Sequence, residues 1–414
     1  MPQINTHNDY AVVMIGLFRS DQLLSSTTIS LAAEWCKTKQ VIYIDRPYSF
    51  KDFWQQRKTN DIKSKFTKFG LRKYKYRIEQ KDNKTNYHVL LLPLLIPCAF
   101  LSDGFIYKQL NKLNNFIIKK EIEKTLKHFN IKKYIFINSF LPSVPPNLLG
   151  NAAIKPLLNI YQTVDDISQE PYIAKHGVRE EKEAFELCDL GIATSTGLSK
   201  KYNFINGKKI VVVANAADFS LFENAKFNKY PLPDELKNIA KPIILYTGHY
   251  SSLRFNHKLV LQIANKFKNC SLVFVGSFNP NDVQKHGLKD LPNVYFTGLK
   301  PITALPAFIH YSNVAIIPYA ANQLTANIYP LKINEYLASG IPTVTSNFSE
   351  DIPTFAPEAY VANSDEEFLH HIEKALSEDF TLLAEKRMQK AKVNTWQSRI
   401  EQLSKLIDER INKI

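Results

Sequence analysis

Short runs of hydrophobic, often β-branched residues alternate along the chain with stretches whose hydrophobic positions recur every three or four residues. The short runs are typical of buried strands and the periodic stretches of helices. In the first half, strands are predicted at 11–17, 41–45, 88–92, 134–138, 158–162, 191–194 and 210–214, and helices at 27–37, 107–128 and 179–187. This alternation predicts βαβ units and a parallel sheet.

A second series of the same kind follows a polar segment. Residues 215–241 contain two prolines and no clear periodicity, which indicates a linker. Beyond it, strands are predicted at 242–247, 271–275, 294–297, 314–318 and 343–346, and helices at 257–267, 302–311, 330–339, 365–376 and 382–411. The chain is therefore expected to have an α/β fold with two doubly wound Rossmann-like domains, 1–214 and 242–414. The two domains are expected to face a central cleft, and the last helix could pack back on the first domain. Ligands of such open sheets bind beyond the carboxyl ends of the strands.

Composition agrees with two globular domains. A length of 414 residues exceeds what one hydrophobic core usually organises, and 45% hydrophobic residues exclude disorder as the main state. The four cysteines have neither metal-ligand nor disulfide-framework spacing, so we expect a reducing compartment and no structural zinc.

No segment predicts export or membrane insertion. The polar start, residues 1–9, does not resemble a signal peptide. The longest hydrophobic run, 89–101, has 13 residues and two prolines, well short of the roughly 20 that a spanning helix needs. Any membrane contact is expected to be peripheral.

The net charge of +14 is concentrated in one segment. Residues 46–84 hold 13 basic and four acidic residues, interleaved with eight aromatic ones. Such a mixture suits an anionic lipid surface, because cations attract headgroups while rings settle at the interface. It could also bind single-stranded nucleic acid by stacking, or be a solvated basic excursion whose rings cover the domain beneath it. We favour the membrane-facing interpretation and do not expect nucleic acid as a partner.

Two common nucleotide sites are absent. Neither the dinucleotide-binding spacing G-x-G-x-x-G nor a Walker A loop occurs after any predicted strand. The chain is therefore not expected to be a dehydrogenase or a P-loop ATPase.

The most informative segment is 329–346. Pro330 suits the first position of a helix and Gly340 its end, so a short helix leads directly into a strand. The start of this helix offers unpaired backbone N–H groups, and Lys332 adds a charge there, which together form an anion site. Glu335 lies one turn deeper, where its carboxylate could accept hydrogen bonds from a diol such as ribose. The alternative is that Lys332 and Glu335 are an ordinary i,i+3 pair on a solvated face.

This segment resembles the donor-binding segment of GT-B glycosyltransferases of the "group 1" type, family 4 and its relatives. Further marks of that family occur in the expected order over nearly the whole chain. They are the linker start Val213–Asp218, Gly248, Arg254, Lys258, Gly276 and Gly298.

The resemblance implies a nucleotide-diphosphate sugar as donor substrate, held mainly by the C-terminal domain. Glu335 would hold the ribose hydroxyls, Lys332 and Arg254 with backbone N–H groups would neutralise the diphosphate, and Gly298 would face the base. Two cations and a helix end can stabilise the leaving group without a metal, so we expect neither a metal nor a cofactor.

One position departs from the family. Family 4 enzymes carry two glutamates eight residues apart, and the residue eight before Glu335 is Asn327. This leaves open whether the anomeric configuration is retained or inverted. Inverting relatives use a carboxylate base from the N-terminal domain instead.

The pair Asp165–Asp166 is the candidate for that base. It follows a predicted strand at its carboxyl end, where either residue could deprotonate an acceptor hydroxyl. The sequence around it resembles teichuronic-acid-type and exopolysaccharide transferases. A role as helix cap or as metal ligand is the alternative, although adjacent residues on an extended strand point to opposite faces.

Smaller candidates lie in other predicted loops. Gly16 and Arg19, after the first strand, could approach the acceptor or the diphosphate. His176, His249 and His257 stand near loops, where a single histidine is more often structural.

Together these features predict a metal-independent hexosyl- or glucuronosyltransferase that acts on a polysaccharide or lipid-linked acceptor in cell-surface glycan synthesis. It is expected in the cytoplasm, peripheral at the inner face of the cell membrane. One rival is a non-hydrolysing nucleotide-sugar epimerase on the same architecture. Another is a non-catalytic polyanion-binding protein on a degenerate scaffold, which would not need a ribose-facing carboxylate.

Overall fold

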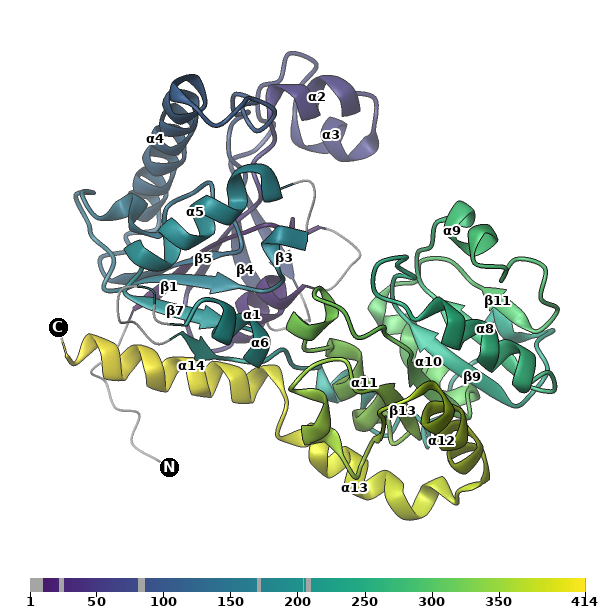
Figure 1. Ribbon diagram of the computed structural model, residues 1–414. Coiled ribbons are helices and arrows are strands. Elements are labelled where there is room, and N and C mark those ends of the chain that lie inside the picture. Colours follow the sequence, from purple (N-terminus) through teal and green to yellow (C-terminus); the bar gives the residue numbers. More distant parts are fainter. Residues whose placement is uncertain are drawn as a thin grey trace. The chain divides into compact units, whose positions relative to one another are not determined.

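The computed structural model describes residues 10–21, 26–80, 86–169, 173–203, 205 and 210–413 (Figure 1). The chain divides into two compact units. Unit 1 consists of Met1–Thr194, Leu198–Val213 and Ile400–Ile414, and unit 2 of Ser195–Gly197 and Ala214–Arg399.

Unit 1 is built on an eight-stranded sheet with the order β3-β4-β2-β1-β5-β6-β7-β8. Its strands are β1 Ala11–Gly16, β2 Val41–Ile44, β3 Tyr76–Gln80, β4 Asn86–Leu90, β5 Tyr134–Ser139, β6 Asn159–Thr163, β7 Leu190–Ala193 and β8 Val211–Val212. Every neighbouring pair is parallel except β3 and β4. The central strand β1 is buried along its whole length, as a parallel strand covered on both faces must be.

Helices cross between these strands. They are α1 Thr27–Trp35, α2 Phe50–Gln56, α3 Asn60–Lys65, α4 Phe105–His128, α5 Ala174–Leu187 and α6 Thr196–Lys201, with 3₁₀ turns at Pro146–Leu149 and Ile167–Gln169. The last helix, α14 Trp396–Ile411, joins unit 1 from residue 400 onward. Its side chains reach the backbone of the β7 and β8 region, since Gln402 donates to the Val212 carbonyl and Arg410 to the Asp189 carbonyl, each at 3.0 Å.

The basic segment 46–84 is partly folded into a small core of its own. It contains α2, α3 and the edge strand β3, and three of its aromatic rings, Tyr48, Phe53 and Phe66, are buried. They pack with Ile62, Leu91 and Leu94. Lys81, Asp82 and Lys84 of this segment lie outside the described residues. Some aromatic rings of the segment therefore form this core, and others face solvent.

Unit 2 has a six-stranded sheet in the order β11-β10-β9-β12-β13-β14, with every neighbouring pair parallel. The strands are β9 Ile243–Thr247, β10 Ser271–Val275, β11 Val294–Phe296, β12 Val314–Ile317, β13 Thr343–Ser346 and β14 Tyr360–Ala362. The helices are α7 Phe219–Phe222, α8 His257–Lys266, α9 Pro280–Lys285, α10 Leu305–Tyr311, α11 Leu331–Ser339, α12 Asp365–Ser377 and α13 Phe380–Lys392. Short 3₁₀ turns occur at Asp234–Leu236, Ile302–Ala304, Thr325–Asn327 and Ile352–Phe355.

Two predictions about this half are wrong. Residues 215–241 are not a free linker, because Phe222 and Leu236 are buried in the core of unit 2. The helix predicted over 382–411 is two helices, since α13 ends at Lys392 and Thr395 accepts a hydrogen bond from the backbone of Ser398 to begin α14. Such a cap supplies the acceptor that a new helix start needs.

The predicted fold class, two doubly wound α/β units, is confirmed. Among the residues that the structure describes, no helix has the length and hydrophobicity needed to cross a bilayer.

Candidate functional site

The candidate donor site lies at the start of α11 in unit 2. Pro330 has extended backbone angles and precedes the helix, which begins at Leu331, one residue later than predicted. Gly340 ends the helix with φ +83°, a left-handed conformation that favours glycine. The first-turn N–H groups of α11 therefore remain available to an anion, with Lys332 beside them.

Lys332 is held by two buried tyrosines. Its Nζ lies 3.1 Å from the hydroxyl of Tyr319, which in turn lies 2.9 Å from the hydroxyl of Tyr246. The ammonium also lies 5.5 and 5.2 Å from the centres of these two rings. Among the described residues, no carboxylate lies within ion-pair distance of Lys332, so its charge is not neutralised by a salt bridge.

Glycine allows the lysine to approach the end of β9. Gly248 follows β9 with φ +123°, and a Cβ there would lie 3.3 Å from Cε of Lys332. Gly276 follows β10, and a Cβ at that position would lie 2.0 Å from the carbonyl oxygen of Gly248. The carboxyl ends of β9 and β10 therefore come together in a way that only glycine permits.

Arg254 contributes a second positive charge to the same place. Burial by itself would raise the pKa of Tyr319, but the charges of Lys332 and Arg254 outweigh it and lower this pKa below its usual value. The backbone of Arg254 is fixed to the segment after β12, because its carbonyl accepts from the N–H of Ala320 at 2.9 Å. Positive charges that lower this pKa will also stabilise the oxygens of a bound anion.

Glu335 lies one turn further along α11 and is partly exposed. Desolvation raises its pKa to about 7; Lys332 opposes this shift, and the nearby carboxylate of Asp218 adds to it. Among the described residues, no hydrogen bond to the Glu335 side chain is found. A partly desolvated carboxylate without a protein donor is suited to accept hydrogen bonds from a ligand.

Asn327 occupies a different environment. It ends the turn Thr325–Asn327, and its carbonyl accepts a 2.7 Å hydrogen bond from the hydroxyl of Ser195. A Cβ at Gly197 would lie 2.6 Å from its Oδ1. The structure thus packs Asn327 against the segment Ser195–Gly197 of the same unit.

Other family marks in unit 2 are less closely associated with Lys332. Gly298 has φ +77° and pairs with Gly276 in an isolated bridge at the end of β11. Lys258 is exposed, and its charge acts on Glu366 instead. The helix α11, and not the start of α8, therefore supplies the lysine of this cluster.

The histidine candidates have structural partners. His249 Nδ1 lies 2.9 Å from the hydroxyl of Ser277. His257 stacks on His286 with ring centres 3.5 Å apart, and His176 stacks on Tyr107 at 3.7 Å. These contacts explain the three rings without a ligand.

In unit 1 the structure separates the two adjacent aspartates. Asp166 is buried, and its Oδ1 accepts hydrogen bonds from the backbone and the hydroxyl of Ser168, at 3.0 and 2.6 Å, and from Lys201. Burial opposes ionisation, but these bonds outweigh it and lower the pKa of Asp166. Asp165 is partly exposed beyond the carboxyl end of β6. The two side chains therefore have different environments, and both lie beyond the end of β6 at Thr163 instead of on an extended strand.

The first loop of unit 1 is tightly packed. A Cβ at Gly16 would lie 2.9 Å from both Thr28 Cγ2 and the Tyr43 hydroxyl, so protein fills the space beside it. The guanidinium of Arg19 lies 3.5 Å from the centre of the Tyr48 ring, and its buried Nε has no hydrogen-bond partner among the described residues.

Three residues near Lys332 and Glu335 were not predicted as site residues: Tyr246, Tyr319 and Asp218. Tyr319 directly follows a predicted strand, and Asp218 ends the family-like segment Val213–Asp218. These two positions in the sequence could have identified both residues as site candidates. Within the described ranges, no group of three or more His, Cys, Asp or Glu side chains could hold a metal ion.

Parts of the chain are similar in sequence to known glycosyltransferases. Residues 241–378 match the family model described as glycosyl transferases group 1. A putative teichuronic acid biosynthesis glycosyltransferase, TuaH of Bacillus subtilis strain 168, is 25% identical over 154 residues, which are 37% of this chain and 38% of the relative. The match therefore spans well under half of that relative's length.

Solved structures are similar over almost the entire chain. Sucrose-phosphate synthase from Thermosynechococcus elongatus has a TM-score of 0.65 at 13% identity, covering 98% of this chain and 100% of the other. An α,α-trehalose-phosphate synthase (UDP-forming) from Burkholderia xenovorans, in complex with glucose-6-phosphate, has a TM-score of 0.63 at 9% identity, covering 96% and 100%. At these identities the likeness concerns the fold, which is the two-domain GT-B fold.

Proposed function

The chain carries a group 1 glycosyl transferase domain on a GT-B fold, and from this premise we propose that it transfers a sugar from a nucleotide-diphosphate sugar to a polysaccharide or lipid-linked acceptor. The observation that carries the proposal is the cluster of Lys332, Arg254 and Glu335 at the start of α11. It combines two positive charges that act on Tyr319 with a carboxylate of raised pKa.

The chemistry of the transfer explains the positive charge. The bond between the anomeric carbon and the β-phosphate oxygen breaks, and its electron pair leaves with the nucleoside diphosphate. The acceptor hydroxyl oxygen forms the new bond to that carbon and loses its proton. Because negative charge grows on the diphosphate, Lys332, Arg254 and the first N–H groups of α11 would stabilise the transition state more than the ground state.

Glu335 would hold the ribose. Its ionised carboxylate can accept from two adjacent hydroxyls, and it lies one turn from Lys332, so one ligand can reach both. Gly248, Gly276 and Gly298 would let the backbone approach the nucleotide.

Asp165 is the better candidate for the base if the reaction inverts configuration. Asp166 is committed to Ser168 and Lys201, and a carboxylate of lowered pKa accepts a proton poorly. Asp165→Asn should reduce turnover by roughly 10²- to 10⁴-fold while leaving donor binding intact. Asp166→Asn serves as the matched variant: it should lower stability more than turnover, and full activity in Asp165→Asn would remove Asp165 from the mechanism.

The names of similar proteins support particular classes of acceptor, donor and leaving group. TuaH is described as a putative enzyme of teichuronic acid biosynthesis, which supports a polysaccharide acceptor and a hexosyl or glucuronosyl donor. The trehalose-phosphate synthase is described as UDP-forming, which supports a nucleoside diphosphate as leaving group. Because Lys332 and Arg254 would neutralise the negative charge of the diphosphate, we propose that the reaction does not need a metal ion.

We further propose that the basic segment 46–84 brings the enzyme to a membrane, at the inner face, where lipid-linked acceptors are presented. Phe50, Trp54 and Phe69 are 55, 66 and 77% exposed. Arg57 lies over the Trp54 ring at 4.1 Å and Lys68 over the Phe69 ring at 4.9 Å. Exposed rings paired with cations are suited to the bilayer interface.

A ligand screen tests the function directly. Nucleotide sugars and nucleoside diphosphates would be added to the full chain and thermal unfolding recorded. A ligand at a hundred times its Kd should add roughly 2.7 kcal/mol of stability. Donor binding followed by product formation only with an acceptor supports transfer. A rearranged donor without acceptor would identify an epimerase, and no nucleotide binding at all would contradict both enzyme functions.

A further inference from the structure

The first three turns of α4 expose a row of large hydrophobic side chains. Phe105, Ile106, Leu113 and Phe116 are 76, 65, 45 and 55% exposed. With 3.6 residues per turn they fall within an arc of about 100° on one side of the helix. Single exposed hydrophobic residues are ordinary, but four of them on one side of a helix, with only the exposed Gln109 among them, indicate an interaction surface.

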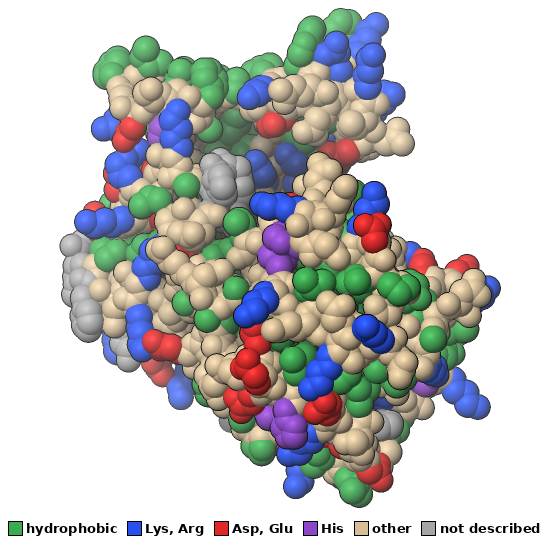
Figure 2. Space-filling model, turned by 45° about the vertical axis from the view of Figure 1, so that its right-hand side comes forward, with side chains coloured by type: hydrophobic (Ala, Val, Ile, Leu, Met, Phe, Trp, Pro, Cys, Tyr) green, Lys and Arg blue, Asp and Glu red, His purple; other side chains and the backbone are tan. Residues whose placement is uncertain are grey.

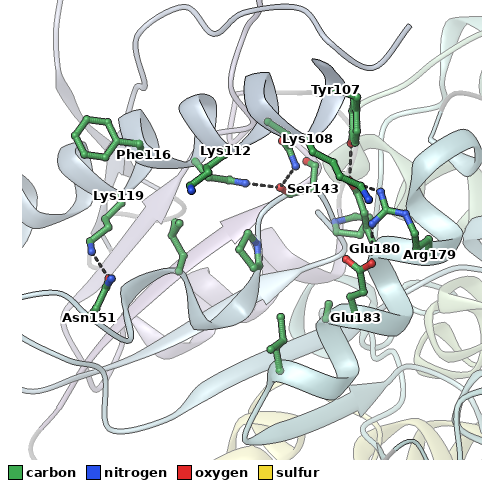
Figure 3. Close-up of a pocket in the computed structure, with 17 residues that line it drawn as sticks. Tyr107, Lys108, Lys112, Phe116, Lys119, Ser143, Asn151, Arg179, Glu180 and Glu183 are labelled. Atoms are coloured by element: carbon green, nitrogen blue, oxygen red, sulfur yellow. Dashed lines mark hydrogen bonds and ion pairs between the residues drawn. The ribbon is translucent and has the colours of Figure 1, made fainter. Parts of the chain in front are cut away.

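Lysines flank this row on one side. Lys108, Lys112 and Lys119 project along the edge of the helix that borders a groove (Figure 3). Lys119 is hydrogen-bonded to Asn151, whereas neither Lys108 nor Lys112 has an ion-pair partner among the described residues. Two exposed lysines thus remain uncompensated beside the hydrophobic row.

The groove between α4 and α5 has a volume of about 540 Å³ and a largely apolar lining. The apolar residues that line it include Phe116, Pro142, Pro145, Leu148, Ala184 and Leu187. Its carboxylates are already engaged: Glu180 accepts from the Tyr107 hydroxyl at 2.5 Å, and Glu183 pairs with Arg179 at 2.7 Å. The unengaged charge at the groove is therefore positive.

This surface lies at the same edge of unit 1 as the basic segment 46–84. The strands β2 and β4 are parallel neighbours, and α2 and α4 each follow the carboxyl end of one of them. Arg72 and Lys75 of the basic segment pair with Glu121 of α4, at 3.1 and 3.3 Å. The helices α2, α3 and α4 are uppermost in Figure 1, and the upper edge of Figure 2 shows hydrophobic side chains next to Lys and Arg side chains.

We propose that the exposed face of the first three turns of α4, with the groove beside it, docks on a bilayer of anionic phospholipid. The rings of Phe105 and Phe116 enter the interface, and Lys108 and Lys112 reach the headgroup phosphates. This inference deepens the proposed membrane association and rests on it. A second copy of the chain fits poorly, because a two-fold contact would place these lysines against each other. A neutral glycan could stack on the rings of Phe105 and Phe116, but it would not require the charges of Lys108 and Lys112.

The test uses the full chain and flotation with phosphatidylcholine vesicles, with and without phosphatidylglycerol, at low and high salt. Replacing Phe105, Ile106 and Phe116 with Ser should lower the partition coefficient at least tenfold. Lys108→Glu with Lys112→Glu should abolish the dependence on phosphatidylglycerol and on salt. The controls are Leu382→Ser with Val393→Ser, and Lys268→Glu with Lys386→Glu, which change exposed residues of unit 2 and should bind like the wild type.

Hydrogen exchange of the unaltered chain gives an independent measurement. Residues 105–116 should become protected when phosphatidylglycerol vesicles are added. Wild-type binding by the serine variant, or unchanged exchange over 105–116, would overturn the role of α4, even if Trp54→Ser and Phe69→Ser still reduced binding. Loss of self-association in the serine variant, without any effect on vesicles, would identify a second copy as the occupant. Nucleotide binding is measured in parallel, so failure here stays distinguishable from failure of the proposed transferase activity.

Discussion

Lys332 in unit 2 is partly buried and Lys65 in unit 1 is fully buried, and the two lysines differ in whether carboxylates neutralise their charge. Lys65 is fully buried, and its Nζ lies 2.7 Å from Asp21, 2.5 Å from Asp61 and 2.8 Å from the Tyr48 hydroxyl. The ammonium of Lys332 donates to the Tyr319 hydroxyl and lies over the rings of Tyr246 and Tyr319, and it has no salt bridge within the described structure. The first lysine is compensated by carboxylates and holds the fold together, whereas the second remains available to an anionic ligand.

The same contrast extends to the neighbours of each lysine. In the basic segment, Arg72 and Lys75 pair with Glu121, and Arg77 pairs with Asp21 and Glu79. At the start of α11, positive charge instead acts on Tyr319 and lowers its pKa. A dense run of basic residues in a sequence is therefore a poor guide to where charge is available, because ion pairs within the fold consume part of it.

The largest effect is expected at Lys332. Lys332→Ala should lower turnover by roughly 10²- to 10³-fold, because a charge that stabilises the leaving diphosphate is lost, while the free energy of unfolding changes little. Lys258→Ala removes an exposed lysine of the same unit and should leave turnover unchanged. Steady-state kinetics and denaturant titration measure the two quantities. Equal turnover in both variants would place the diphosphate elsewhere.

Lys65 should show the reverse pattern. Lys65→Met leaves Asp21 and Asp61 without their shared partner and should cost about 1 to 3 kcal/mol of unfolding free energy, less than a fully buried pair because both carboxylates are partly exposed. Nucleotide affinity should not change. The control is Lys63→Met on the same helix, whose side chain is exposed. If Lys65→Met unfolds like the wild type but binds nucleotide more weakly, Lys65 binds the ligand and does not stabilise the fold.

Glu335 connects stability with binding through pH. Its folded pKa of about 7 lies above its usual value, so the folded state holds the proton more tightly, and the associated stability is lost as the pH rises through 7. Glu335→Gln should therefore raise the free energy of unfolding at pH 8 by about 1 to 3 kcal/mol, with little effect near pH 4.5.

Donor binding should respond with the opposite sign. The ionised carboxylate accepts two hydroxyl hydrogen bonds, so wild-type nucleotide affinity should increase between pH 6 and pH 8, and Glu335→Gln should flatten this dependence. Calorimetric titration at both pH values provides the measurement. A wild-type affinity that is independent of pH would separate Glu335 from the ribose.

The smallest effect is expected at Tyr319. Tyr319→Phe keeps the ring beside Lys332 but removes the hydroxyl hydrogen bond, which should weaken nucleotide diphosphate binding by about 1 kcal/mol. Tyr246→Phe leaves the Lys332–Tyr319 hydrogen bond in place and should have a smaller effect still. If Tyr319→Phe binds as tightly as the wild type, the hydroxyl does not position Lys332.

Hydrophobic periodicity by itself determined much of this protein. All strands of the two sheets except β3 and β14, the helix that Gly340 ends and the positions of Lys332 and Glu335 on it follow from local pattern and backbone preference, which depend on neighbours in the chain. The strands β3 and β14 were not predicted. For the same reason the candidate loops after β6 and β9 could be located from the sequence.

Only the tertiary structure decided which polar groups meet. It placed Tyr319 and Tyr246 against Lys332, committed Asp166 to Lys201, buried Lys65 among aspartates and packed residues 215–241 into unit 2. It also exposed Phe105 and Phe116 on α4, which was predicted only as a helix over 107–128. Contacts of this kind depend on which elements pack together. The burial that results sets the pKa of Glu335 and decides which charges are available to a ligand. The periodicity of a single segment contains no information about contacts with other segments or about burial by them.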